Sequence, residues 1–259
     1  MIWITWRRYR VRLVIVAMYV LVLIVFMIIT EHAFQVAVHK CVQALTPNVH
    51  INCSSASPVG PDTKVMRPFS RVLRTESHAS QVAIGILFLP ILIGSVFGTP
   101  LIASEMDAKT NRLAWSQSVT RTRWFLTSWL TLAIPAVSAM SLFALIVQWW
   151  VTHINASLFS GGGLNQQLPF EISGVVAIAY TIFALSFGVC VGILVRRFVS
   201  PYPVTFLIGG YVGSYVCEEN RYPLNTHYWE GQWNAAAIFL AMSAVLLGLT
   251  VVAVRRWRT

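Results

Sequence analysis

Long apolar runs separated by shorter polar segments dominate the chain. A bilayer core of about 30 Å is crossed by roughly 20 helical residues, and most of these runs are about that long. The runs predict six membrane-spanning helices, at residues 13–30, 82–103, 124–150, 173–195, 198–217 and 233–254. The fifth is the weakest, because its apolar part, 203–217, is short unless residues 198–202 extend it. The pattern predicts an all-α integral membrane protein with a single transmembrane domain over residues 1–259.

The first apolar run has the position of a secretory signal peptide. Residues 13–30 are longer than the usual apolar region of such a peptide, and no small-x-small cleavage site follows before Glu31. We therefore expect this segment to be an uncleaved first helix.

Basic residues are distributed unevenly among the connecting segments. With the N-terminus inside, thirteen of the 19 Lys and Arg residues lie in cytoplasmic segments, and the long outer loop 31–81 carries most of the rest. The positive-inside rule then predicts that both termini are cytoplasmic. Composition supports the same class, because 56% hydrophobic and 11% charged residues are atypical of a soluble enzyme. The net charge of +10 is spread over the ends of apolar runs, so no nucleic-acid-binding surface is expected.

The extracytoplasmic loop 31–81 contains two cysteines. Cys41 and Cys53 fall on the side of the membrane where disulfides form, so we predict a possible bridge between them. The alternative is a zinc site made by these cysteines with His39 and His50, but the spacing is not that of a standard zinc finger. No metal site is therefore predicted.

No catalytic motif was found, and no predicted span has a charged residue or a histidine in its interior. Proton-driven carriers usually need such groups at membrane depth. Cys190 and Cys217 lie in spans and are expected to be small core residues. Gly188 and Gly192 form a G-x-x-x-G pattern, which predicts close helix packing, with a dimer face or a flexing pathway as the alternative. We expect no catalytic residues in this chain.

The cytoplasmic loop 104–123, between the second and third spans, is polar with a few apolar anchors. From its residues alone it could serve only to fix topology. It also carries a recognisable pattern, which continues at both ends of the chain: GTPLIASE at 98–105, Thr110, RLAW at 112–115, QSVTR at 117–121, RW at 123–124, WITWR at 3–7 with Arg10, and Tyr228, Trp229 and Gln232.

In these segments the chain resembles the type-2 ABC exporter permeases of actinobacteria. The resemblance implies that loop 104–123 forms a coupling helix that docks on an ATP-binding subunit. The residues it assigns to that contact are Glu105, Arg112, Trp115, Gln117 and Arg121. It assigns an interfacial elbow helix to the N-terminus, with Trp3, Trp6, Arg7 and Arg10. It also implies a short re-entrant segment before the sixth helix.

The same resemblance implies the partners and the location. Two copies of an ABC ATP-binding subunit would bind ATP and Mg, and this chain would hold no cofactor. A second permease copy or a related permease would complete the path through a bacterial cytoplasmic membrane, in contact with membrane lipid. The resemblance implies export, and the neutral spans suit an amphipathic or hydrophobic substrate, such as a drug, peptide or lipid. The alternative is a non-transporting membrane sensor or immunity protein that uses loop 31–81 as its receptor.

Overall fold

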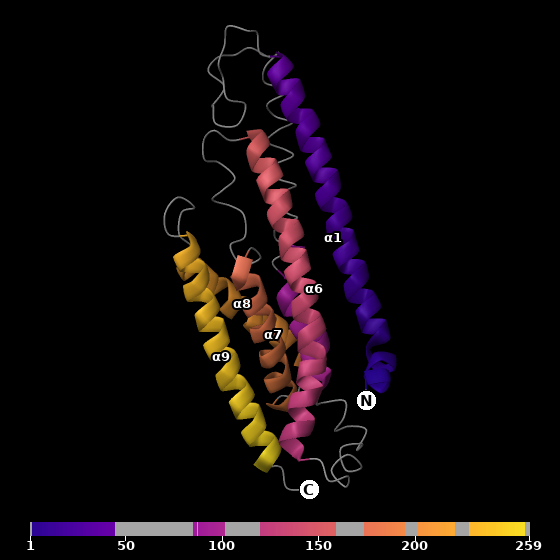
Figure 1. Cartoon of the computed structure of the whole chain (residues 1–259), viewed down its shortest axis with the longest axis vertical. Helices are drawn as coiled ribbons and strands as arrows, with labels where there is room; N and C mark the ends of the chain where they lie inside the picture. The colour runs from indigo at the N-terminus through magenta and orange to yellow at the C-terminus, as the bar shows by residue number, and fades with distance from the viewer. Residues whose placement is uncertain are drawn as a thin grey trace. The chain divides into compact units, whose positions relative to one another are not determined.

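The structure is a computed structural model, and it describes residues 2–44, 85–86, 88–101, 120–158, 174–194, 201–220 and 228–256. These ranges are almost entirely helical and contain no β-strand (Figure 1). The prediction of an all-helical protein is therefore confirmed for the described part. Its elements are α1 (Ile2–Ala44), α3 (Leu89–Ile93), the π-helix η1 (Gly94–Gly98), α6 (Arg121–Leu158), α7 (Gly174–Leu194), α8 (Pro201–Glu219) and α9 (Tyr228–Arg256).

Four of the described helices are long and apolar enough to cross a membrane. They are Val11–Ala33, Thr122–Trp149, Gly174–Leu194 and Trp229–Arg256. These segments coincide with the first, third, fourth and sixth predicted spans. Their length and composition indicate a membrane protein.

The second and fifth predicted spans look different in the structure. Within 82–103, the described residues form a shorter apolar helix, Leu89–Leu101, interrupted by the π-helical turn of η1. Pro100 contributes to this interruption because it has no N–H to donate to the carbonyl of Val96. The fifth span corresponds to α8, whose 19 residues are not among the four strongly apolar helices, because glycine, tyrosine and glutamate lower its hydropathy.

Three helices extend beyond the apolar runs that predicted them. α1 continues to Ala44, so the first part of loop 31–81 is helical, and α6 continues to Leu158. α9 begins at Tyr228, five residues before the predicted sixth span. An apolar run therefore marks the membrane-compatible part of each helix, whereas the backbone hydrogen bonding continues through polar residues as well.

The chain divides into two compact units. One contains Met1–Val16, Phe88–Leu145 and Phe170–Thr259, and the other contains Ala17–Leu87 and Ile146–Pro169. In the second unit, the Tyr19 hydroxyl donates a hydrogen bond of 2.7 Å to the carbonyl of Gly85. Met27 and Ile86 are buried in the same unit.

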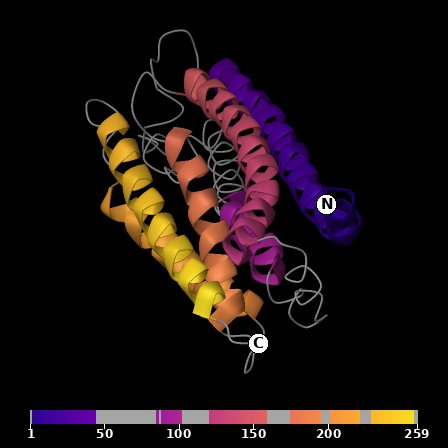
Figure 2. The same ribbon diagram turned by 60° about the horizontal axis from the view of Figure 1, so that its bottom comes forward.

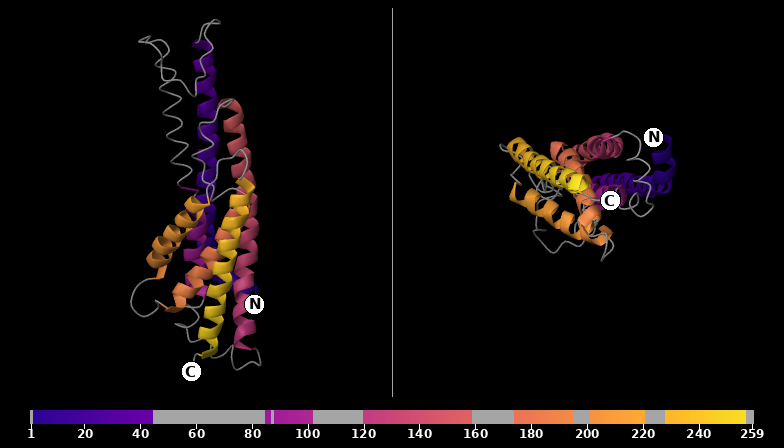
Figure 3. Two further views of the ribbon diagram at one scale, coloured as in Figure 1. Left: turned by 90° about the vertical axis from the view of Figure 1, so that its left-hand side faces the viewer. Right: turned by 90° about the horizontal axis from the view of Figure 1, so that it is seen from below.

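The core of the first unit is built around α7. In its most apolar window 78% of the residues are buried, against 22% in the corresponding window of α9, which runs beside α7 (Figure 2). α8 packs against α7 as well and is inclined relative to α9 (Figure 3). α7 is therefore the central helix of this unit.

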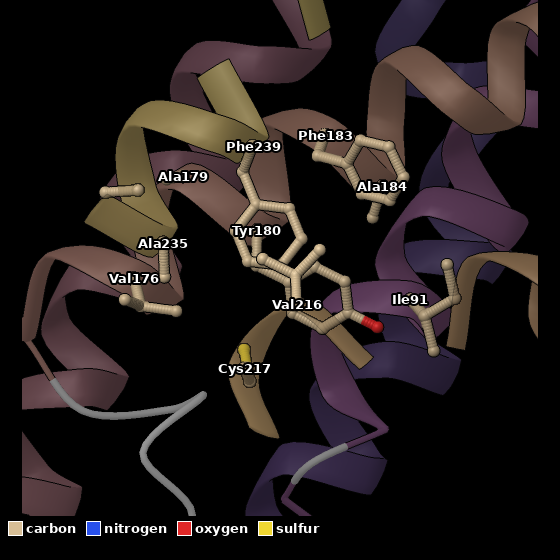
Figure 4. Packing of buried hydrophobic residues seen from close by; sticks show 11 residues of the cluster. Ile91, Val176, Ala179, Tyr180, Phe183, Ala184, Val216, Cys217, Ala235 and Phe239 are labelled. Carbon is tan, nitrogen blue, oxygen red and sulfur yellow. The ribbon is translucent and has the colours of Figure 1, made fainter. Parts of the chain in front are cut away.

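Aromatic rings fill the space between α7 and α9 (Figure 4). The ring of Phe239 lies 5.1 Å from that of Tyr180 and 5.5 Å from that of Phe183, measured between centroids. The Tyr180 hydroxyl donates a 3.3 Å hydrogen bond to the carbonyl of Gly209 on α8. These aromatic side chains belong to one cluster that joins α3, α7, α8 and α9. Its buried members are Ile91, Val176, Ala179, Tyr180, Phe183, Ala184, Val216, Cys217, Ala235, Ala236 and Phe239.

Candidate functional site

The predicted coupling loop, residues 104–123, is described only from Thr120 onward. Glu105, Arg112, Trp115 and Gln117 lie outside the described residues, and Arg121 is described in its backbone as the first residue of α6. The last residues of the predicted loop thus form the first turn of α6. The residues on either side of the loop, Leu101 before it and Phe125 after it, lie within the described part of the chain.

Both ends of the loop are anchored in one buried apolar cluster. Leu101 precedes the loop, and Phe125 follows it; the cluster also contains Val189 of α7 and Val254 of α9. We call these four residues the loop base. Phe125 is completely buried, and Val189 and Val254 are each only 1% exposed. Such close packing resists relative displacement, because every movement forfeits dispersion contacts.

The start of α6 is fixed by hydrogen bonds as well. The Thr120 hydroxyl accepts a 3.4 Å hydrogen bond from the backbone N–H of Arg123, and the Thr120 carbonyl accepts one of 3.0 Å from the N–H of Trp124. Thr120 is thus a typical N-cap residue, which satisfies an N–H group that the helix itself leaves without an acceptor. This cap defines where the loop ends and the helix begins.

A side chain from the far end of the chain reaches the same turn. The Nε of Arg255, in the last turn of α9, donates a 3.1 Å hydrogen bond to the Oγ1 of Thr122. Figure 3 shows the end of α9 beside the start of α6. The first turn of α6 therefore contacts α9 through the loop base and through this hydrogen bond.

The segment that leads into the loop packs on α7 through backbone atoms. A methyl group at Gly188 would overlap the carbonyl oxygen of Gly94, and one at Gly192 would overlap that of Thr99. On the segment that faces α7, a Cβ at Gly98 would lie 2.7 Å from the Leu185 carbonyl oxygen. Only glycine permits so close an approach of two helices. We call these contacts the glycine seam.

The first turn of α7 is held by a buried glutamine of α9. Gln232 is completely buried, and its Oε1 accepts a 3.1 Å hydrogen bond from the N–H of Val176. Gly174 has a φ of 62°, and a Cβ there would lie 2.9 Å from the same oxygen. The amide thus caps α7 from a neighbouring helix, and a glycine is required beside it.

Comparison with known proteins supplies the family. The model of a family described as ABC-2 membrane transporter related matches residues 12–221. The chain belongs to this family. No curated protein and no solved structure matches it. ABC-2 proteins are membrane permease components of ABC transporters and generally work with an ATP-binding subunit.

The ABC-2 match covers the loop base except for Val254, and it ends before Gln232 and Arg255. From the sequence, Gln232 contributes only to the family resemblance and Arg255 only to the predicted topology. A signal for Gln232 was available, since an amide flanked by an apolar run usually has a partner when it is buried. Nothing in the sequence pairs Arg255 with Thr122, because the two residues are 133 positions apart.

For the remaining predicted residues of this ABC-2 protein, the structure describes the backbone at most and no side chain. Trp3, Trp6, Arg7 and Arg10 lie in the first turns of α1, which continues into the first span. Their interfacial role stays a prediction. Cys41 lies in the last turn of α1 and Cys53 outside the described residues, so their bridge also stays a prediction. Among the described residues, no group of three or more His, Cys, Asp or Glu could hold a metal ion.

Proposed function

We propose that this chain is the membrane-spanning permease subunit of an ABC exporter. It moves an amphipathic or hydrophobic substrate across a bacterial cytoplasmic membrane, using ATP that a separate subunit hydrolyses. The observation that carries the proposal is the ABC-2 family match over residues 12–221. The four strongly apolar helices support a role within the membrane.

In this proposal both termini and loop 104–123 face the cytoplasm, where the ATP-binding subunit docks. Glu105, Arg112, Trp115, Gln117 and Arg121 form or brace the contact, and ATP with Mg is bound by the partner. Two ATP-binding subunits act on a pair of permeases, which are two copies of this chain or this chain and a relative.

The loop base explains how docking would act on the membrane helices. Leu101, Phe125, Val189 and Val254 come from segments before and after the loop and from α7 and α9. A force that displaces either flank of the loop would therefore act on both helices through packed side chains. Packed side chains of this kind transmit displacement because they have little room to rearrange.

The test begins with purification of the tagged chain from its native membranes in a mild detergent. We expect an ATP-binding subunit with a Walker motif to copurify in stoichiometric amount and to hydrolyse ATP. Replacement of Trp115 by alanine should reduce the copurified ATPase at least about tenfold, because truncating an aromatic hot-spot residue of an interface costs about 2 kcal/mol or more. The control is Asn111→Ala, in the same loop but not among the assigned contacts.

Recovery of the chain alone, without an ATPase, across several detergents would contradict the exporter proposal. That result would instead favour a sensor or immunity protein acting through loop 31–81. Equal ATPase recovery with Trp115→Ala and with wild type would overturn the assignment of the docking contact while leaving the permease function intact.

A further inference from the structure

The contact between Arg255 and Thr122 joins two elements that are each firmly anchored. Next to Arg255, Val254 is 1% exposed, and three residues after Thr122, Phe125 is completely buried. Both buried neighbours belong to the loop base. The 3.1 Å hydrogen bond therefore links two fixed backbones and is more than a chance contact of a long side chain.

Charge alone does not account for this contact. Arg255 and Arg256 both lie in the last turn of α9, where either would complement the helix dipole and fix the topology. Both side chains are exposed. Within the described part of the chain, Arg256 makes no hydrogen bond like the one from Arg255 to Thr122. The two arginines share one electrostatic setting and differ in this contact.

From this geometry we infer that Arg255 is a positioning residue for energy coupling. It ties the point where the predicted coupling loop re-enters the membrane to the end of α9, so that a displacement of the loop moves α9. The inference rests on the proposed function, because it requires an ATP-binding subunit that acts on the loop.

A displacement of α9 can be transmitted to α7 because the two helices contact each other at several positions along their length. Phe239 packs on Tyr180 and Phe183, with centroid distances of 5.1 and 5.5 Å. Nearer the start of α9, Gln232 accepts the hydrogen bond from Val176. The side chains interlock along the shared length of the two helices, so α9 and α7 move together. Arg255 then acts on the central helix of the unit without touching it.

The contact is better suited to coupling than to stability. The hydrogen bond is exposed to solvent, so water replaces it when it is broken, and the folded state loses little. A coupling role instead predicts a change in turnover at unchanged stability. That combination separates a positioning residue from a merely structural one.

The experiment measures ATP hydrolysis by the permease and its ATP-binding subunit, reconstituted together in liposomes and normalised to assembled complex. Arg255→Gln and Thr122→Val should each lower the permease-dependent hydrolysis about two- to tenfold, the range that one such hydrogen bond represents. The double variant should fall no further than either single variant, since all three lose the same bond. Thr122→Ser keeps the acceptor and should retain wild-type turnover.

Arg256→Gln is the matched control, because it removes the same charge from the same helical turn. It should leave turnover unchanged, and all variants should melt at the wild-type temperature. Wild-type turnover in Arg255→Gln, an equal loss in Arg256→Gln, or additive losses in the double variant would overturn the inference while leaving the permease function standing. A wild-type chain that neither binds nor stimulates an ATPase would overturn the proposed function, and the role of Arg255 with it.

Discussion

The glycine seam makes a sharp prediction at Gly188. Replacement by alanine adds one methyl group, which would overlap the carbonyl oxygen of Gly94 and lie 3.3 Å from the Cα of Gly98. These neighbours are backbone atoms within a packed helix, so they cannot rotate away as a flexible side chain would. The helix carrying η1 and α7 must instead separate locally.

The magnitude follows from two opposing terms. Overpacking of a well-packed interior costs about 1–3 kcal/mol, and an obstacle made of backbone belongs in the upper part of that range. Alanine in place of a helical glycine returns about 0.5–1 kcal/mol through lower chain entropy in the unfolded state. We therefore expect a net loss of about 1–2 kcal/mol in the free energy of unfolding. That corresponds to a fall of about 2–8 °C in melting temperature for a chain of this size.

The assay is thermal unfolding of the purified protein in detergent, followed by circular dichroism. Gly248→Ala on α9 is the matched control, because a Cβ there has no atom within 4 Å. It should melt at or slightly above the wild-type temperature. Equal melting of Gly188→Ala and Gly248→Ala would refute the argument, since the two differ in the space around the new methyl group.

Two further predictions concern buried groups. Gln232→Leu removes the acceptor of the Val176 N–H in a fully buried position and should lower the free energy of unfolding by about 1–3 kcal/mol. The control Gln148→Leu, at an exposed position of α6, should be close to neutral. Similar melting temperatures of the two variants would contradict the cap. Cys190 is buried, so a maleimide should label it in detergent at least about tenfold more slowly than a cysteine placed at the 73% exposed Leu194, in backgrounds lacking the other cysteines. Mass spectrometry gives the rates, and equally fast labelling of the two positions would refute the burial of Cys190.

The apolar runs were sufficient to predict helices, because a helix is the one way for a single segment to satisfy its backbone in a membrane. The same runs did not set the helix ends. α1 passes through Glu31 and continues to Ala44, where hydropathy no longer marks a span. Hydropathy also gave no sign of η1, since a π-turn depends on local hydrogen bonding around Pro100 and not on polarity.

The location of the candidate site could be predicted from the sequence, whereas its contacts with other helices are visible only in the structure. The loop residues from Glu105 to Arg121 were selected by resemblance, and their contacts stay predictions. Gly188 and Gly192 were selected by their spacing, but the spacing does not name the partner, which in this fold is the segment containing Gly94 and Thr99. Small residues permit a close approach by any helix, so the choice is made by the packing of the whole unit.

The sequence by itself determined the class of the molecule: an apolar, helical chain with the characteristics of an ABC-2 membrane protein. These properties depend on residue type and local spacing, which one chain displays without reference to its folded form. Only the tertiary structure decided that Leu101, Phe125, Val189 and Val254 form one cluster, and that Arg255 bonds to Thr122. Contacts between residues more than a hundred positions apart are set by how all helices pack at once, and no local pattern encodes them.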